Sequence, residues 1–252
     1  MRNIIVIAKN TFRETIRDRI LYGILGFAAL YILLDLFMAR LALGDLVMIK
    51  SFGLAGIYLF GLMITIFLGA SILYKEIERR TLYFVLSKPV SRRQVILGKF
   101  AGLFTAVIFT TALMAVIYLA VIFYEGGGFD YLGLLAIFMQ VVEMGLFIAL
   151  LIFFSSFAAP MTSTVCAVLV LFSGHLLDSV LKNSKLIGGL TYRLIKAAYY
   201  VLPNLEKFNI RNIVVHRVAI MPASVLWAVA YAVFYSVLLL FFASVIFKKR
   251  EL

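Results

Sequence analysis

The sequence predicts an all-α polytopic membrane protein, and three observations support that fold class. Of the 252 residues, 64% are hydrophobic and only 14% are charged. A soluble domain is about half apolar and about a quarter charged, so this composition is typical of chains whose helices cross a bilayer. The apolar residues fall into six runs, and each run is near the length of about 20 residues that a helix needs to span the bilayer core. None of the runs alternates polar and apolar residues as a transmembrane β-strand does.

The chain divides into a short N-terminal helix, residues 1–19, and a six-helix transmembrane domain, residues 20–252. The predicted spans are residues 20–38, 52–74, 100–124, 131–157, 161–181 and 223–247. Backbone groups in lipid must form their hydrogen bonds within the span, so each run is expected to be a helix.

The segment before the first span has an amphipathic helical pattern. Its apolar residues recur every three or four positions, at Ile5, Ala8, Phe12, Ile16 and Ile20. Its basic residues recur every four positions, at Lys9, Arg13 and Arg17. A basic amphipathic helix of this kind lies in the membrane interface, and the alternative is a solvated extension of the first span. No small-residue cleavage site follows, so a cleaved signal peptide is not expected.

The distribution of lysine and arginine predicts that both termini face the cytoplasm. With that topology, fifteen basic residues lie in cytoplasmic segments and nine lie outside, seven of them in the long connection 182–222. The short outer loops hold only Arg40 and Lys50. Short loops rich in basic residues stay in the cytoplasm, so we expect an N-in, C-in protein. Trp227, near the start of the last span, suits an aromatic belt at the interface.

One short cytoplasmic connection, residues 75–99, concentrates charge in an otherwise apolar chain. Pro89 divides it, because the residue before a proline is pushed out of the α region. Ser91 is expected to cap a helix that continues into the third span. Arg92 and Arg93 then lie at a helix N-terminus, where cations are unfavourable, so they indicate an anionic partner such as lipid headgroups or protein carboxylates. The alternative is that these charges only set the topology.

This connection resembles the signature of ABC-2-type transporter permeases. In that family an acidic pair and Thr-Leu follow the second span, and Pro-hydrophobic-Ser-Arg and then Gly-Lys lead into the third. The matching residues are Glu76, Glu78, Arg79, Arg80, Thr81, Leu82, Leu86, Pro89, Val90, Ser91, Arg92, Gly98 and Lys99. Many relatives have Arg-Gly-Thr where this chain has Arg79-Arg80-Thr81. The small-residue turn at 154–160 is also similar, and residues 202–209 resemble a subgroup that includes permeases associated with nitrous-oxide reductase maturation.

The resemblance implies the permease subunit of an ATP-binding-cassette transporter in a bacterial or archaeal inner membrane. It implies a separate cytoplasmic ATPase subunit, a second permease chain and contact with membrane lipids. Residues 75–99 would be the coupling loop that fits a groove on the ATPase. The coupling residues implied are Glu76, Glu78, Arg79, Arg80, Thr81, Leu82, Leu86, Pro89 and Arg92. Export is the direction implied, and no residue identifies the cargo as an ion, a small molecule or a lipid.

The chain itself is not expected to be an enzyme or to bind a cofactor. The nucleotide motif Gly-x-x-x-x-Gly-Lys fails before Gly98-Lys99, because Arg93 occupies the position of the first glycine. Zinc-protease and nucleophile-elbow motifs are absent from the sequence. An intramembrane enzyme and an ATPase-independent channel or scaffold are the alternatives. Nucleic acid is not an expected partner, because the basic residues flank apolar runs.

Few ionisable residues fall inside the predicted spans, and Glu143 is the most informative. It lies near the middle of the fourth span, with Gln140 one turn before it on the same face. A charge at mid-bilayer costs about 2.5–3.5 kcal/mol, so Glu143 must face protein or water. Glu143 and Gln140 therefore mark either a substrate path or proton-linked group, or an interhelical hydrogen bond.

The remaining polar residues predict local structure. Asp35 is expected near the outer interface, and His175 and Asp178 are expected to be neighbours on one helix rather than a metal site. Cys166 lies in an apolar run, so neither a disulfide framework nor a thiolate site is expected. Within 182–222, the spacing of apolar residues predicts a short amphipathic helix over 190–201 that covers the outer mouth of the bundle. Its role as a gate, a docking site or a structural cover stays open.

Overall fold

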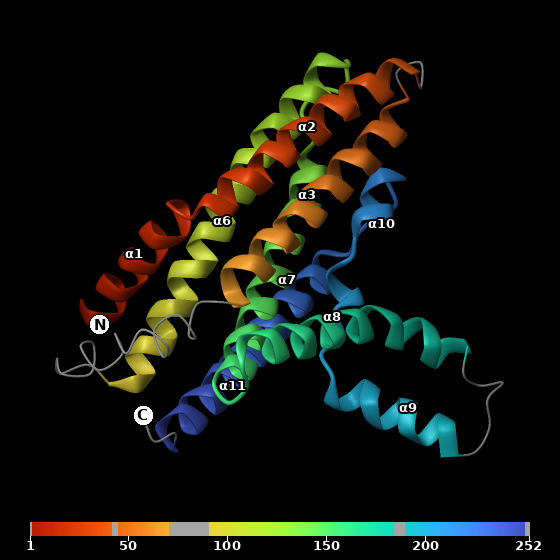
Figure 1. Cartoon of the computed structure of the whole chain (residues 1–252). Coiled ribbons are helices and arrows are strands. Elements are labelled where there is room, and N and C mark those ends of the chain that lie inside the picture. Colours follow the sequence, from red (N-terminus) through yellow and green to blue (C-terminus); the bar gives the residue numbers. More distant parts are fainter. Residues whose placement is uncertain (1, 42–44, 71–90, 184–189, 250–252) are drawn as a thin grey trace.

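The computed structural model describes residues 2–41, 45–70, 91–183 and 190–249, and within these ranges the chain is helical with no strand. Figure 1 shows long helices packed along one another. The all-α fold class is therefore confirmed. The helices are α1 (Arg2–Ile16), α2 (Arg19–Leu41), α3 (Leu46–Ala70), α6 (Arg92–Tyr124), α7 (Tyr131–Ser155), α8 (Pro160–Asn183), α9 (Leu190–Val201), the 3₁₀ turn η2 (Glu206–Phe208), α10 (Arg211–Val215) and α11 (Pro222–Lys249).

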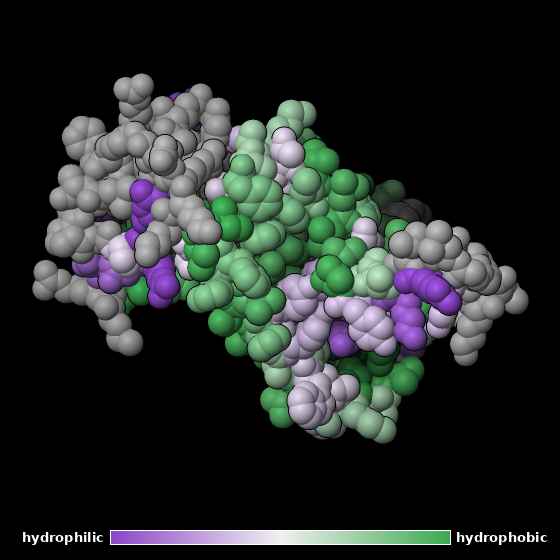
Figure 2. All heavy atoms as spheres, turned by 90° about the horizontal axis from the view of Figure 1, so that it is seen from below, coloured by the Kyte–Doolittle hydropathy of each residue, from purple (hydrophilic) through white to green (hydrophobic). Residues whose placement is uncertain are grey.

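Five of these helices are long and apolar enough to cross a membrane, namely α3, α6, α7, α8 and α11. The first predicted span corresponds to α2, whose 23 residues make a helix about 34 Å long. Its described apolar portion, Arg19–Tyr31, is shorter than a full crossing. The face drawn in Figure 2 is broadly hydrophobic, with hydrophilic residues gathered toward its two sides. The chain is a multi-pass membrane protein, and the sixth crossing stays a prediction.

α7 is the central helix of the bundle. It packs against α3, α6, α8 and α11, and 78% of its most apolar stretch is buried inside the protein. Leu146, Phe147 and Leu151 are fully buried on it. A polar side chain on α7 therefore faces other helices rather than lipid.

α8 and α9 extend to one side of the bundle (Figure 1). Only 17% of the most apolar stretch of α8 is buried inside the protein. The predicted helix over 190–201 is confirmed as α9, but its predicted place over the mouth of the bundle is wrong. α9 packs mainly on α8, whereas η2 and α10 contact α7, and α10 also contacts α3. The segment after α9 is thus the part of 182–222 that lies against the bundle.

α1 is separated from α2 by a break at Arg17 and Asp18, where Oδ1 of Asp18 accepts a hydrogen bond from the amide of Ile20 at 3.0 Å. α1 packs against α6. Its buried residues include Thr11 and Thr15, whereas Ile5 on the predicted apolar stripe is exposed. The helix has its predicted amphipathic pattern, and its place in the membrane interface stays a prediction.

Two helix starts bear on the predicted boundaries. Ser91 caps α6 as predicted, because its Oγ accepts from the amide of Gln94 at 3.3 Å and its own amide donates to Gln94 Oε1 at 3.0 Å. The start predicted for the second span was wrong, since α3 begins at Leu46. Lys50, which we expected in a loop, therefore lies inside a helix and is buried.

Candidate functional site

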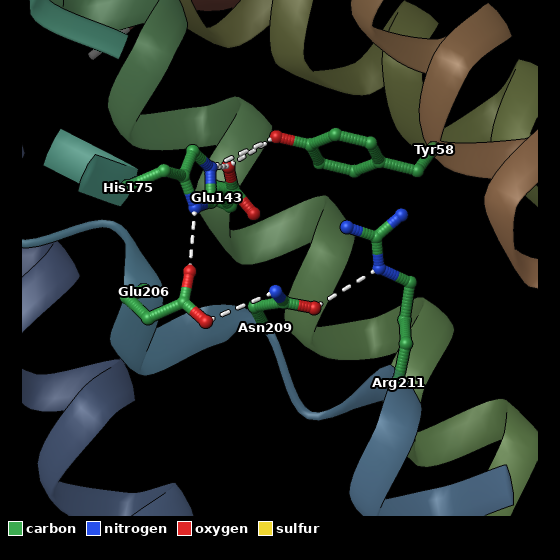
Figure 3. Close-up of polar contacts among 6 residues, drawn as sticks. All are labelled: Tyr58, Glu143, His175, Glu206, Asn209 and Arg211. Carbon is green, nitrogen blue, oxygen red and sulfur yellow. Dashed lines mark hydrogen bonds and ion pairs between the residues drawn. The ribbon is translucent and has the colours of Figure 1, made fainter. Parts of the chain in front are cut away.

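A cluster of polar side chains lies where α3, α7, α8 and the segment 206–211 meet (Figure 3). We call it the polar cluster. Its members are Tyr58, Glu143, His175, Glu206, Asn209 and Arg211. Five of them lie on five separate elements, and Asn209 lies in the connection between η2 and α10, in a bundle that is otherwise mainly apolar.

The inner half of the polar cluster centres on the carboxylate of Glu143. Its Oε1 accepts a hydrogen bond from the hydroxyl of Tyr58 at 2.8 Å and lies 2.8 Å from Nε2 of His175. The hydroxyl of Tyr58 is also 3.0 Å from that ring nitrogen. The predicted interhelical hydrogen bond of Glu143 is therefore present, and it joins α7 to both α3 and α8.

The outer half of the polar cluster is built by the segment 206–211. Nδ1 of His175 lies 3.0 Å from Oε2 of Glu206, and Oε1 of Glu206 accepts from the amide of Asn209 at 3.1 Å. Nε of Arg211 donates to Oδ1 of Asn209 at 3.1 Å, and the guanidinium carbon lies 4.3 Å from the ring centroid of Tyr58. This cation–π contact closes the chain of contacts back onto α3.

The polar cluster runs from the interior of the bundle to its surface. The side chain of Glu143 is 3% exposed and that of His175 is 18% exposed, whereas that of Glu206 is 37% exposed. The polar cluster therefore connects a partly exposed carboxylate at one end with a buried carboxylate at the other.

Glu206 is aimed at His175 by the packing of its neighbours. Leu205 and Phe208 are fully buried, so the turn between them presents Glu206 to the bundle. The amide of Leu205 donates to the carbonyl of Gly174 at 3.2 Å. A Cβ atom at Gly174 would lie 2.6 Å from the carbonyl oxygen of Pro203, so glycine is needed beside His175 for the segment to approach α8.

Gln140 lies one turn before Glu143, as predicted, but it contacts a different group. Its Nε2 donates to the carbonyl of Leu54 on α3 at 3.2 Å. Its Oε1 is buried and has no hydrogen-bond partner among the described residues. An unpaired buried acceptor is costly, and it is suited to a ligand that brings a donor.

A second polar group links the starts of α3 and α7. Nζ of Lys50 lies 3.0 Å from Oδ1 of Asp130, and the hydroxyl of Tyr118 donates to Oδ2 of Asp130 at 2.8 Å. All three residues are buried. Because Tyr118 is on α6, this group holds three helices together, and it was not predicted from the sequence.

No set of three histidine, cysteine, aspartate or glutamate residues in the described part of the chain is arranged to hold a metal ion. The His175 ring lies between the carboxylates of Glu206 and Glu143, which contact Nδ1 and Nε2 respectively. His175 and Asp178 are neighbours on α8, as expected, and the two ring nitrogens of His175 contact Glu143 and Glu206.

Most of the predicted coupling residues lie outside the described residues. These are Glu76, Glu78, Arg79, Arg80, Thr81, Leu82, Leu86 and Pro89. The side chain of Asp35 is also outside them.

Arg92 is the predicted coupling residue that the structure describes. Its Nη1 donates to the carbonyl of Phe247 at 2.6 Å, and its guanidinium carbon lies 5.7 Å from the centroid of the Phe247 ring. The negative partner of Arg92 thus includes the C-terminal end of α11, where the helix dipole favours a cation.

Tyr58, Glu206, Asn209 and Arg211 were not predicted as members of a site with Glu143. Residues 202–209 did stand out by resemblance, and that stretch supplies Glu206 and Asn209. Nothing in the local spacing links Tyr58 to this stretch.

Comparison with protein families gives one match across nearly the whole chain. The family model described as ABC-2 family transporter protein matches residues 5–252. These residues include every described helix from the first turn of α1 onward. The search of curated proteins gave no match.

Proposed function

Because this chain belongs to the ABC-2 transporter family, we propose that it is the permease subunit of an ATP-binding-cassette transporter driven by a separate cytoplasmic ATPase. The family match over residues 5–252 carries this proposal. The members of the family are membrane components of transporters, and the five long apolar helices suit that role.

We assign energy transmission to residues 75–99, with Glu76, Glu78, Arg79 and Arg80 as polar docking contacts. The contacts at the end of this loop support the assignment. Arg92 binds the last turns of α11, and a few residues later α6 contacts α1 closely at Gly98 and Gly102. A force on the start of α6 would therefore be passed to α1 and α11 as a rigid-body movement.

We place the substrate path along the face of α7 that carries Gln140 and Glu143. Both side chains are buried in the most enclosed helix of the bundle. Buried ionisable groups in membrane helices face partners or substrate pathways, because exposing them to lipid is costly. The unpaired Oε1 of Gln140 favours a cargo with a hydrogen-bond donor.

The segment 202–215 would act as the gate of this path. It is held to α8 through Glu206 and His175, and Arg211 lies over Tyr58 on α3. We propose export as the direction, an N-in, C-in topology in the inner membrane of a bacterium or archaeon, and a working unit of two permease chains and two ATPase chains. The likeness of residues 202–209 to permeases of nitrous-oxide reductase maturation is likewise a proposal.

Affinity purification of the tagged, full-length chain from its native membrane tests the permease proposal. We expect a soluble ATP-binding subunit to co-purify and to hydrolyse ATP when the complex is placed in lipid. A chain that purifies alone and carries an ion current or an enzymatic activity by itself would overturn the proposal.

A further inference from the structure

We propose that Glu206, His175 and Glu143 form a proton relay that carries protons from the surface of the segment 202–215 to the buried carboxyl group of Glu143. We call these three residues the relay triad. The relay is a property of the folded chain, and its use in moving cargo rests on the proposed function as a permease.

The relay triad has the geometry that proton transfer needs. Oε2 of Glu206 lies 3.0 Å from Nδ1 of His175, and Nε2 on the other side of the ring lies 2.8 Å from Oε1 of Glu143. Both separations are ordinary hydrogen-bond distances, along which a positioned acid and base exchange protons. Glu206 is the exposed end, because 37% of its side chain is exposed. Glu143 is the buried end, because only 3% of its side chain is exposed.

The two contacts determine how many protons the relay triad holds. A ring nitrogen without hydrogen and an ionised carboxylate are both acceptors, so they repel when they face each other. Each of the two nitrogen–oxygen contacts therefore requires one proton. Two protons shared among His175 and two carboxyl groups leave the relay triad with one net negative charge.

Transfer through the relay triad conserves these two protons. In the first state Glu206 carries a proton that it donates to Nδ1, and Nε2 carries a proton that it donates to Glu143. The O–H bond of Glu206 breaks as an N–H bond forms at Nδ1, and the N–H bond at Nε2 breaks as an O–H bond forms on Glu143. In the second state Glu206 is ionised, Glu143 is a neutral acid, and both contacts remain hydrogen bonds.

The surroundings of the relay triad favour this second state. A negative charge on Glu143 lies in the most buried helix, where an ionised carboxylate is costly. A charge on Glu206 is partly exposed and accepts a hydrogen bond from the side-chain amide of Asn209, whose Oδ1 accepts from Arg211. Movement of a proton inward therefore moves the negative charge outward.

The charged and titratable groups around His175 come from each element of the site. α3 contributes the hydroxyl of Tyr58, which donates to Glu143. α7 contributes Glu143 and η2 contributes Glu206. Arg211 of α10 reaches the site through Asn209, and Asp178 follows one turn later on α8, the helix of His175 itself. Tyr58 already uses its proton for Glu143, so it can stabilise either state without being part of the transfer.

The relay gives the permease a way to couple cargo to protons. Glu143 lies one turn from Gln140 on the proposed substrate path. A cargo that displaces the hydrogen bonds of Glu143 would receive or release its proton there, and Glu206 would restore it from water. Each transport cycle would then take up or release protons on the side where Glu206 lies.

Hydrogen–deuterium exchange followed by infrared spectroscopy tests the relay in the full-length protein in lipid nanodiscs. The band of a protonated, buried carboxyl group is assigned to Glu143 by its loss in Glu143→Gln. We expect this band to shift promptly in D₂O in the unaltered protein. In His175→Gln, which keeps a hydrogen-bonding side chain that does not relay protons, the exchange should slow by roughly 100-fold.

Two further variants test the entry group of the relay and provide a control. Glu206→Gln removes the entry group at a partly exposed position and should slow the exchange of Glu143 as His175→Gln does. Glu14→Gln, at an exposed position of α1 far from the relay in the chain, is the matched control and should leave the exchange rate close to that of the unaltered protein. Absence of the Glu143 band, or an exchange rate unchanged in both His175→Gln and Glu206→Gln, would overturn the relay.

The relay and the permease proposal fail separately. If no ATPase subunit binds while exchange at Glu143 still depends on His175, the proposed function is wrong and the relay stands. If the ATPase subunit binds and exchange at Glu143 is independent of His175, the relay is wrong and the proposed function stands.

Discussion

Nε2 of His175 on α8 lies 2.8 Å from Oε1 of Glu143 on α7, although 32 residues separate the two in the chain. This contact joins the least buried of the five long apolar helices to the most buried one. Only a small part of the apolar span of α8 is buried, so the polar contacts of His175 help to fix its position. The Glu143–His175 pair is therefore both a structural link and the inner step of the proposed relay.

Replacement of Glu143 by alanine should destabilise the protein more than replacement by glutamine. Alanine leaves the hydroxyl of Tyr58 and the ring of His175 without their shared partner, and an unpaired buried polar group costs about 1–3 kcal/mol. Glutamine keeps an acceptor oxygen in place. The free energies of unfolding can be compared in detergent, with Glu14→Ala on the exposed surface of α1 as the control. Equal stability of the two Glu143 variants would show that the contacts of this carboxylate contribute nothing to stability.

The buried pair of Lys50 and Asp130 gives a second stability prediction. Lys50→Met leaves the Asp130 carboxylate buried with only Tyr118 among its observed partners, and breaking a buried pair costs about 3–5 kcal/mol. The double variant Lys50→Met, Asp130→Asn removes both charges and keeps an oxygen for Tyr118, so it should recover most of the loss. Thermal unfolding measures both variants.

The control for this pair is Lys196→Met, which removes a lysine from an exposed position on α9 and should change stability little. A double variant as unstable as Lys50→Met alone would contradict the account of a paired buried charge.

The close contact of α1 with α6 predicts opposite effects for two glycine substitutions. In Gly102→Ala the new Cβ atom would lie 2.5 Å from Cβ of Thr11 and 2.6 Å from the carbonyl oxygen of Ala8. α1 must move to accommodate it, and such overpacking costs about 1–3 kcal/mol. In Gly26→Ala on α2 the added atom meets nothing within 4 Å, so the higher helix propensity of alanine should stabilise by up to about 1 kcal/mol. Chemical denaturation of both variants checks the signs, and a neutral Gly102→Ala would argue against the close packing.

Arg92 should stabilise the C-terminal end of α11. Without its donor to the carbonyl of Phe247, the last turn of α11 loses a cation at its negative end, which is worth about 0.3–1 kcal/mol. Arg92→Ala should therefore speed amide exchange in the last turn of α11, measured by mass spectrometry. Arg93→Ala, the adjacent exposed arginine, is the matched control, and the same exchange in both variants would rule out the specific role of Arg92.

Local chemistry was predictable from the sequence where a short segment carries all the information. The cap at Ser91 and the helix over 190–201 depend on neighbouring residues, and both are present. Glu143 could be identified as informative because a carboxylate in an apolar run is costly wherever the helix packs. The partners of Glu143 were not predictable, because Tyr58 and His175 reach it only through the packing of three helices.

Two features of the structure have a common physical cause. The predicted second span left Lys50 in a loop, whereas α3 begins at Leu46 and Lys50 is buried beside the distant Asp130. His175 and Asp178 are neighbours on α8 as expected, but the carboxylates at the ring come from other elements, Glu143 on α7 and Glu206 in η2. Local sequence patterns do not show which distant charged side chains will contact each other in the folded chain.

The coupling of the loop 75–99 to an ATPase is tested most directly by a double charge reversal, Glu78→Arg with Arg79→Glu, in the purified complex in lipid. The control is the same reversal at the exposed neighbours Arg13 and Glu14 of α1. We predict that the loop variant loses stimulation of ATP hydrolysis by the permease, whereas the control retains it. Full stimulation in the loop variant would contradict the account of this chain as a permease driven through that loop.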